Sequence, residues 1–250
     1  MNLDLRHRTI LVTGAAQGLG LGIARHLACA HARLALVDSN PAVVDHLDDP
    51  IFRDSAIALV KDLALPNAAQ ELMHSTLTEL GYLNGLVNCA AWSFHKPLLE
   101  TTISDFDQVI AVNQRAPYFL IQEFVRALDE GASDPCVVNI ASVNAVIGNK
   151  NLTAYAATKG ALVAMGRAIA VELAPRIRVV TVSPGAVLTK YTEGLIAQGE
   201  LDVDRLLDRL LLKKFTTVDE IADLVVFLFG PSAKSITGSN WIIDGGVTAQ

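Results

Sequence analysis

Residues 9–20 read TILVTGAAQGLG, and this stretch decides the fold. Residues 9–13 are apolar or β-branched, which predicts a buried strand, and glycines follow at positions 14, 18 and 20. Glycines between a strand and a helix permit a tight turn whose backbone amides approach a pyrophosphate at the helix N-terminus. The spacing Gly-x-x-x-Gly-x-Gly at this first turn therefore predicts a dinucleotide-binding site.

From this turn onward, short apolar runs alternate with longer helix-like segments. Further strands are predicted at 33–37, 56–60, 85–88, 136–140, 179–182 and 240–243. Helices are predicted from about 66, 102, 153 and 217, and Thr102 forms a capping-box pattern with Asp105. Such alternation implies parallel strands joined by right-handed crossovers. We therefore expect one α/β domain over residues 1–250, a Rossmann-like doubly wound parallel sheet of about seven strands with helices on both faces.

Residues 188–214 form the one irregular stretch of the sequence. The segment follows the sixth predicted strand, and ligands of open α/β sheets bind outside the carboxyl ends of the strands. We expect a helical lid over the cleft, with a packed surface excursion as the alternative.

Composition excludes several classes of protein. A chain of 250 residues with 51% hydrophobic residues fits one large domain with a sheet buried on both faces. The net charge of −6 argues against a nucleic-acid partner. Three scattered cysteines form neither a disulfide framework nor a zinc-ligand cluster. No stretch predicts a membrane span or a signal peptide, so the expectation is a soluble cytoplasmic protein that binds a small molecule.

Asp38 closes the second predicted strand. A carboxylate at that position accepts hydrogen bonds from the adenosine ribose hydroxyls and repels a 2′-phosphate. Neither Gln17 nor Ser39 offers a positive charge to a phosphate, so NAD is favoured over NADP. The alternative is a turn aspartate ahead of Ser39, Asn40 and Pro41.

Tyr155 and Lys159 lie four residues apart in a helix-like segment and therefore share one face. A free tyrosine titrates at about pH 10 and is a poor base at neutral pH. A neighbouring ammonium favours the phenolate and lowers that pKa. A shift of about three units needs roughly 4 kcal/mol, which a close cation could supply with help from a positive nicotinamide ring. Taken alone, the pattern Tyr-x-x-x-Lys is common and usually marks a solvated helix face.

Over essentially its whole length, the sequence resembles the short-chain dehydrogenase/reductase family. Asn88-Cys89-Ala90-Ala91 is similar to the family's Asn-Asn-Ala-Gly element, and the Asp-Gly-Gly at 244–246 is similar to its C-terminal signature. Ser142 precedes Tyr155 by thirteen residues, the usual family interval. The resemblance identifies a catalytic tetrad of Asn113, Ser142, Tyr155 and Lys159.

The resemblance implies a role for each member of the tetrad. Tyr155 is the general acid/base for the alcohol proton, and Lys159 lowers the Tyr155 pKa and binds the nicotinamide ribose. Ser142 polarises the substrate carbonyl, and Asn113 positions a water that links Lys159 to solvent. The hydride passes directly to or from the nicotinamide, and no metal is needed. The expected cofactor-binding residues are Gly14, Gln17, Gly18, Leu19, Gly20, Asp38, Asp62, Leu63, Asn88, Ala90, Tyr155, Lys159, Pro184, Gly185, Val187 and Thr189.

Three features separate this sequence from parts of the family. Cys89 stands where Asn is common, and Ala91 stands where Gly is usual. Both substitutions are small and lie beside the cofactor, so the catalytic chemistry is expected to be retained. Enoyl reductases of related fold use a longer interval between tyrosine and lysine, so that activity is disfavoured.

Loops after the fourth, fifth and sixth strands are expected to contact the substrate. The candidate substrate residues are Trp92, Phe94, Asn144, Asn149 and Tyr191, with His95, Ile147, Lys150 and Asn151 beside them. Amides and aromatic rings suit a sugar, a sugar acid or a polyol, whereas Trp92 and Phe94 also suit a flat apolar substrate. Residues 149–151 could equally form an exposed polar turn.

The expected function is NAD-dependent oxidation of a secondary alcohol or reduction of its ketone. An NADPH-dependent ketoacyl or carbonyl reductase is a second hypothesis, against which Asp38 argues. An NAD(H)-sensing binding protein without turnover is a third, against which the complete tetrad argues. The resemblance also implies a homo-oligomer, a dimer or a tetramer. The small residues at 154–166 could pack between subunits or against the chain's own sheet.

Overall fold

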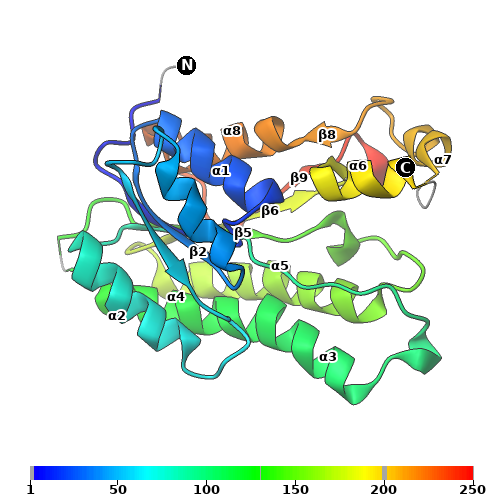
Figure 1. The fold of residues 1–250 in the computed structure, drawn as a ribbon, viewed down its shortest axis with the longest axis horizontal. Coiled ribbons are helices and arrows are strands. Elements are labelled where there is room, and N and C mark those ends of the chain that lie inside the picture. Colours follow the sequence, from blue (N-terminus) through cyan, green and yellow to red (C-terminus); the bar gives the residue numbers. More distant parts are fainter. Residues whose placement is uncertain (1–2, 130, 199–201, 250) are drawn as a thin grey trace.

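Seven parallel strands form one sheet at the centre of the molecule, in the order β3-β2-β1-β4-β5-β6-β9 (Figure 1). The strands are β1 (Thr9–Thr13), β2 (Arg33–Asp38), β3 (Ala56–Val60), β4 (Gly85–Asn88), β5 (Cys136–Ile140), β6 (Arg178–Pro184) and β9 (Asn240–Ile243). The structure is a computed structural model that describes residues 3–129, 131–198 and 202–249, except the side chains of Lys190, Tyr191 and Leu195. The strand order reverses between β1 and β4, where open α/β sheets bind ligands. The predicted doubly wound sheet is confirmed.

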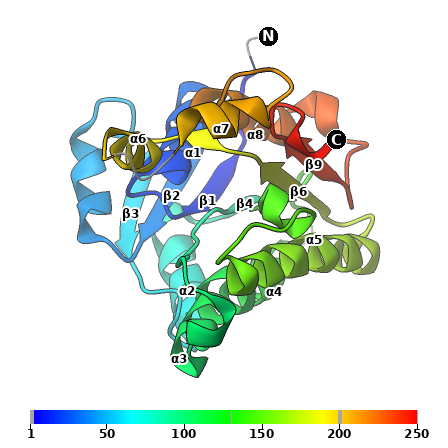
Figure 2. The same cartoon turned by 90° about the vertical axis from the view of Figure 1, so that its right-hand side faces the viewer.

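Helices cover both faces of the sheet (Figure 2). Helices α1 (Gly18–Cys29) and α8 (Val218–Phe229) lie on one face, and α2 (Ala68–Leu80), α4 (Ala116–Ala127) and α5 (Thr153–Leu173) lie on the other. Residues of β1 alternate between the two layers: Ile10 and Val12 join the apolar cluster under α1 and α8, and Leu11 joins the cluster under α2 and α4. Burial on both faces explains why the strands read as continuous apolar runs.

Helix α1 packs along α8, although the two helices lie far apart in the sequence. Ile23 and Leu27 of α1 belong to the same buried cluster as Ile221 and Val225 of α8. All four side chains are fully buried. Helix α1, which begins at the glycine turn, is therefore held in place by α8.

The helix predicted from Thr102 is interrupted. Helix α3 (Ile103–Ile110) is joined to α4 by a single turn of π-helix at Ala111–Arg115. The capping box is present, because the Asp105 amide donates to Thr102 Oγ1 at 3.1 Å and the Thr102 amide donates to Asp105 Oδ2 at 3.1 Å. Turns of π-helix concentrate at functional sites, and this one carries Asn113.

Residues 188–214 leave the main sheet and return to it. A small two-stranded parallel sheet, β7 (Val187–Leu188) and β8 (Thr216–Thr217), closes the base of this excursion. Where the structure describes it, the segment forms helices α6 (Lys190–Ala197) and α7 (Val203–Asp208). Sequence patterns did not indicate the small sheet, and motion of the segment as a lid stays a prediction.

A cluster of buried charge lies at the amino-terminal ends of the strands. Arg8 and Arg178 are 1% and 7% exposed and share the Asp134 carboxylate, with Arg8 Nη2 at 2.6 Å from Oδ2 and Arg178 Nε at 2.8 Å from Oδ1. Arg8 also donates to the Phe229 carbonyl at 2.8 Å, and Arg178 to the Leu228 carbonyl at 3.1 Å. Burial alone would raise the pKa of Asp134, but the two guanidinium groups outweigh it and hold that pKa below its usual value. The cluster ties β1, β6 and the end of α8 together.

Candidate active site

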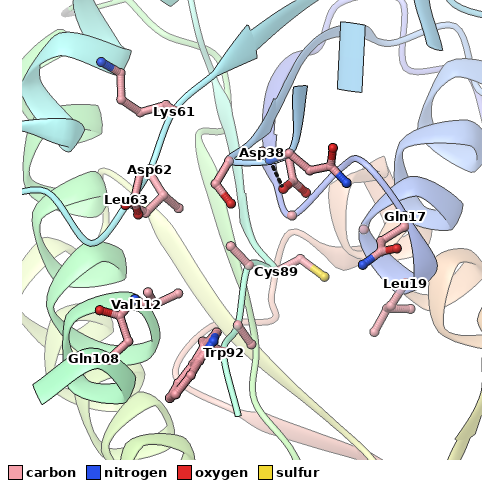
Figure 3. Close-up of a pocket in the computed structure, with 16 residues that line it drawn as sticks. Gln17, Leu19, Asp38, Lys61, Asp62, Leu63, Cys89, Trp92, Gln108 and Val112 are labelled. Atoms are coloured by element: carbon pink, nitrogen blue, oxygen red, sulfur yellow. Dashed lines mark hydrogen bonds between the residues drawn. The ribbon is translucent and has the colours of Figure 1, made fainter. Parts of the chain in front are cut away.

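A cleft of about 580 Å³ opens at the carboxyl ends of β1, β2 and β4 (Figure 3). The expected cofactor residues that line it are Gly14, Gln17, Leu19, Gly20, Asp38, Asp62, Leu63 and Ala90. Residues that also line it, and that the sequence did not single out for a cofactor, are Ser39, Asn40, Lys61, Cys89, Ala91, Trp92, Gln108 and Val112. The cleft has the size of a ligand site and lies where the strand order reverses, so it is the candidate dinucleotide site.

The glycine turn brings backbone to the cleft with no side chain in the way. Gly14 has a φ of +72°, and a Cβ there would lie 2.8 Å from the Cα of Ala90. A Cβ on Gly20 would lie 2.0 Å from the Gly14 carbonyl oxygen. The amides of Cys89 and Ala90 donate to Thr13 Oγ1 at 3.0 and 3.1 Å, which fixes the turn against the loop after β4. This bare backbone cradle at a helix N-terminus fits a pyrophosphate.

Replacing Gly20 with alanine is expected to weaken NADH binding by about 10-fold and to lower the free energy of unfolding by about 1–3 kcal/mol. The new methyl group must displace the Gly14 carbonyl, which moves the whole turn. Calorimetric titration and urea unfolding measure the two effects. Gly160→Ala in α5 is the control, because a Cβ there meets its nearest neighbour at 3.8 Å, and we expect its stability to hold or rise. If Gly20→Ala bound NADH with wild-type affinity, the result would contradict the assignment of this turn as the pyrophosphate site.

Asp38 presents its carboxylate to the cleft from the end of β2 (Figure 3). The Ala16 amide donates to Oδ2 at 3.0 Å, and the Asn40 amide donates to Oδ1 at 2.9 Å. Lys61 is the one cation among the described residues that line the cleft, and its Nζ lies 2.7 Å from Oε2 of Glu71. A fixed acid therefore faces the cleft, while the one cation in its described lining is paired with another acid.

Some expected cofactor residues lie outside this cleft. They are Gly18, Asn88, Pro184, Gly185, Val187 and Thr189, together with the catalytic pair Tyr155 and Lys159. Asn88 turns into the sheet, where its Nδ2 donates to Asn139 Oδ1 at 2.8 Å. Residues 184–189 lie at the end of β6 and around β7, further along the sheet. Contact of these residues with a cofactor stays a prediction.

The structure brings Ser142, Tyr155 and Lys159 together beside the cleft. Ser142 follows β5 and hydrogen-bonds to the Tyr155 side chain. Lys159 Nζ donates to the Ile140 carbonyl oxygen at 2.8 Å and lies 5.5 Å from the centroid of the Tyr155 ring. Cys89, which lines the cleft, is a near neighbour of both Lys159 and Tyr155. The serine, the phenol and the ammonium thus form one site next to the candidate dinucleotide site.

Burial dominates the ionisation of this pair. Burial raises the pKa of Tyr155 to about 12, although the hydrogen bond with Ser142 favours the phenolate. Burial also lowers the pKa of Lys159 to about 8. Burial thus outweighs the lowering of the Tyr155 pKa that was expected from Lys159, whose Nζ donates to the Ile140 carbonyl oxygen. The lowering expected of Lys159 together with a bound nicotinamide stays a prediction. Tyr155 needs further positive charge beside it to act as a base at neutral pH.

Asn113 is fully buried in the π-helical turn. The Trp92 amide donates to its Oδ1 at 2.8 Å, and its Nδ2 donates to the Trp92 carbonyl at 2.9 Å and to Thr158 Oγ1 at 3.1 Å. Thr158 Oγ1 in turn donates to the Tyr155 carbonyl at 2.8 Å. Asn113 therefore fastens the loop after β4 to helix α5. Its expected role in positioning a water stays a prediction.

Comparison with known proteins places these residues in a family. A family model described as enoyl-(acyl carrier protein) reductase matches residues 14–248. L-xylulose reductase of Bos taurus is 33% identical over 250 residues and covers 100% of both chains. Cyclopentanol dehydrogenase of Comamonas testosteroni is 31% identical over 246 residues, 97% of this chain and 98% of the relative. A solved glucose/ribitol dehydrogenase of the short-chain dehydrogenase/reductase type from Brucella melitensis has a TM-score of 0.91 at 30% identity and covers 99% of each chain. The chain belongs to the short-chain dehydrogenase/reductase family.

This short-chain dehydrogenase/reductase shares its fold with enzymes that bind nicotinamide cofactors of both kinds. Similar solved structures hold NADH in one case and NADP in another. The cradle of Gly14 and Gly20 fits the pyrophosphate, which the two cofactors share.

A second pocket of about 270 Å³ lies beside Ser142, because the neighbouring Val143 lines it. Asn149, an expected substrate residue, also lines it, and its Nδ2 donates to Asn144 Oδ1 at 2.6 Å. The Asn144 amide donates to Ser142 Oγ at 3.2 Å. Two expected substrate residues are thereby joined to Ser142, and the pocket is the candidate substrate site.

The remaining expected substrate residues lie elsewhere. The Trp92 and Phe94 rings lie against each other with centroids 5.4 Å apart, and Trp92 lines the dinucleotide cleft instead of the substrate pocket. The Tyr191 side chain lies outside the described residues. In the part of the chain that the structure describes, no helix could cross a membrane, and no cluster of His, Cys, Asp and Glu could hold a metal ion.

Proposed function

We propose that this short-chain dehydrogenase/reductase is an NAD-dependent enzyme that transfers a hydride between a secondary alcohol, or its ketone, and the nicotinamide. One observation carries the proposal: the side chains of Tyr155 and Ser142 lie together, next to Cys89 of the cleft and Val143 of the pocket. Proton exchange and binding of a carbonyl oxygen need two such groups. When bound, the nicotinamide supplies the hydride acceptor for oxidation or the hydride donor for reduction.

The residues around this centre divide the remaining work. Tyr155 removes the proton from the alcohol hydroxyl in oxidation and returns it in reduction. Ser142 donates a hydrogen bond to the same substrate oxygen and stabilises the charge that develops on it. Lys159 holds a positive charge close to the Tyr155 ring. Asn113 holds the loop after β4 against helix α5, and so helps to fix the position of Tyr155 on that helix.

The preference for NAD rests on Asp38. Its carboxylate is fixed by two backbone amides and faces the cleft, where it would bind ribose hydroxyls and repel a 2′-phosphate. Lys61, the cation on the same wall, is paired with Glu71.

Replacing Asp38 with serine is expected to lower the ratio of kcat/KM with NAD to kcat/KM with NADP by about 10- to 100-fold, because the repulsion of the 2′-phosphate is removed. Steady-state kinetics with each cofactor measure the ratio. Asp45→Ser is the matched control, since Asp45 is exposed in the following 3₁₀ helix and does not line the cleft. An unchanged ratio in Asp38→Ser would show that Asp38 does not determine the preference for NAD over NADP.

A substrate panel tests the reaction itself. The purified protein is incubated with NAD or NADP and with sugars, sugar acids, polyols, hydroxy acids and sterols, and the reduced nicotinamide is followed by its absorbance. Turnover with NAD on one substrate class is the expected result. NADH binding without turnover on the whole panel would favour a cofactor-sensing protein, and turnover with NADP alone would favour a ketoacyl or carbonyl reductase.

We further propose that the enzyme is a cytoplasmic homo-oligomer, a dimer or a tetramer. Exposed apolar side chains on α4 and α5 support this proposal: Tyr118 is 47% exposed, Phe119 41% and Val171 83%. Their burial between copies would remove apolar surface from water. Light scattering of the purified protein tests the proposal, and a monomer at assay concentration would contradict it.

A further inference from the structure

Aliphatic side chains make up most of the described lining of the substrate pocket. They come from segments far apart in the sequence: the loop between β5 and α5, helix α7 with the residues that follow it, and the C-terminal end of the chain. These side chains include Val143, Ile147, Leu152, Leu206, Leu210 and Val247. Val143 and Leu210 are only 6% and 3% exposed, so the least accessible side chains of the wall offer a ligand no hydrogen-bond partner.

The polar side chains in the described lining lie where solvent reaches them or are already engaged. His95, Lys150 and Arg209 are exposed. Asn149 is partly buried, and its Nδ2 donates to Asn144 Oδ1 at 2.6 Å, while its Oδ1 accepts from Arg209 Nη1 at 3.4 Å. The amide that the sequence suggested for sugar hydroxyls is therefore bonded within the protein.

The Asp-Gly-Gly turn near the end of the chain brings Val247 to the pocket. Asp244 is 7% exposed, and its carboxylate accepts hydrogen bonds from the Gly246 and Thr248 amides, each at 2.8 Å. Gly246 has a φ of +89°, and a Cβ there would lie 2.8 Å from Leu211 Cδ1. The turn is thus packed closely on the residues after α7, at the same end of the molecule (Figure 1), and it fixes one wall of the pocket.

The chemistry of this wall decides between classes of alcohol. A hydroxyl buried without a partner loses free energy, whereas a methylene buried against aliphatic side chains gains it. A polyol would carry several hydroxyls to a wall whose buried side chains cannot bind them. The pocket volume of about 270 Å³ is slightly below the range of about 300–1,000 Å³ that is usual for ligand sites, which favours a compact body over a fused-ring steroid.

We infer that the substrate is a secondary alcohol, or its ketone, whose carbinol carbon carries a compact aliphatic chain or ring without further hydroxyl groups. This inference rests on the proposed function and narrows its substrate class. The aliphatic body packs against Leu206, Leu210 and Val247, and the reacting oxygen lies at Ser142 and Tyr155. In oxidation, the carbinol C–H bond breaks as a hydride that reduces NAD, and the O–H proton goes to Tyr155. The product is the ketone, and its aliphatic body is unchanged.

A pair of alcohols with the same shape tests the inference. In tetrahydropyran-4-ol, an ether oxygen replaces the methylene group opposite the carbinol carbon of cyclohexanol. The kcat/KM for NAD-linked oxidation is measured for both alcohols, for xylitol and for the steroid androsterone. Binding of cyclohexanecarboxamide and of tetrahydropyran-4-carboxamide to the protein with NADH is measured by calorimetry. Their amide carbonyl stands in for the ketone but is not reduced by NADH, so this measurement does not depend on turnover.

Two variants change the polarity of the wall with little change in its shape. Val247→Thr replaces a methyl group with a hydroxyl, which can donate to the ring oxygen, and Leu206→Asn replaces two methyl groups with an amide. Both residues are partly buried, so the substitutions leave the fully buried core intact. Val146→Thr is the matched control, because Val146 is 56% exposed in the loop after β5 and does not line the pocket.

Cyclohexanol is expected to have a kcat/KM about 10- to 100-fold higher than that of tetrahydropyran-4-ol, and xylitol and androsterone should be slower still. This preference should fall by about 3- to 10-fold in Val247→Thr and in Leu206→Asn, and it should be retained in Val146→Thr. Loss of a merely structural contribution would lower both rates together and leave their ratio unchanged. The two amides should show the same order of affinity as the two alcohols show in rate.

The other outcomes separate the inference from the proposed function. Oxidation of tetrahydropyran-4-ol or xylitol at least as fast as of cyclohexanol would overturn the inference and leave the proposed function standing, and so would a preference for androsterone. A preference that survives both substitutions would overturn the assignment to this pocket. Tighter binding of cyclohexanecarboxamide that depends on Val247, in a protein that oxidises no alcohol, would support the inference about the pocket and contradict the proposed dehydrogenase. Neither turnover nor binding of either amide would overturn both.

Discussion

Tyr155→Phe is expected to lower kcat for alcohol oxidation by about a thousand-fold, while the Kd for NADH changes far less. Phenylalanine keeps the ring that lies 5.5 Å from Lys159 Nζ, and so keeps the packing of the site. It removes the only hydroxyl proposed to exchange the substrate proton. Steady-state kinetics give kcat, and calorimetric titration gives the Kd. A variant that retains wild-type kcat would show that another group exchanges this proton.

The same variant should also change the pH profile. The pKa of Tyr155 is raised to about 12 by burial, so the phenol keeps its proton at neutral pH unless a further positive charge is present. Oxidation needs the phenolate, and its kcat/KM should therefore rise with pH through the alkaline range. Reduction needs the phenol and should show no such rise. The residual activity of Tyr155→Phe should lose this dependence, whereas Tyr82→Phe, which alters an exposed tyrosine between α2 and β4, should retain both rate and profile.

Asp134→Ala is expected to lower the free energy of unfolding by about 3–5 kcal/mol. Arg8 and Arg178 are buried, and the substitution leaves both guanidinium groups without the carboxylate that they share. Their hydrogen bonds to main-chain carbonyls remain, but those carbonyls carry no net charge. Urea unfolding followed by circular dichroism measures the loss.

Two comparisons sharpen this second prediction. Asparagine keeps an oxygen acceptor and tolerates the left-handed backbone at this position, where φ is +47°, so Asp134→Asn should lose less stability than Asp134→Ala. The folded-state pKa of Asp134 lies below its ordinary value of 3.8, so its contribution is present above that value and is lost as the pH falls through the folded-state pKa. The difference between wild type and Asp134→Ala should therefore shrink in acid. If wild type and Asp134→Ala had the same free energy of unfolding at neutral pH, the Arg8–Asp134–Arg178 cluster would not stabilise the fold.

The main architecture could be predicted because its signals are local. The strands at 9–13, 85–88 and 136–140 appear as predicted, since a strand buried on both faces reads as an apolar run. The partly buried edge strands at 56–60 and 240–243 also appear as predicted. The helix start at Thr217 was equally clear, because its capping box with Glu220 depends on residues three positions apart. The four-residue spacing put Tyr155 and Lys159 on one helix face, and the family resemblance added Ser142 to them.

Features that depend on long-range contact could not be predicted. The π-helical turn at Asn113 inserts a single extra residue, and α3 before it has only eight residues, too few to define a period from which the shift could be recognised. Strands β7 and β8 have two residues each, too few for a pattern. The raised pKa of Tyr155 comes from burial, which depends on how distant segments pack around the phenol and cannot be deduced from the spacing to Lys159. Lys61 reaches the cleft because β3 pairs with β2, which is a property of the sheet order.

The packing of α1 against α8 has a consequence for the order of folding. Synthesis on the ribosome delivers α1 early, yet Ile23 and Leu27 find Ile221 and Val225 only when most of the chain has been made. Contacts between such distant segments slow folding and leave apolar surface open to association in the meantime. A nascent chain that carries only the first half has the glycine turn but not the helix that holds it still. The nucleotide is therefore expected to bind as a late step, after translation, and cannot serve as a template for the early half of the molecule.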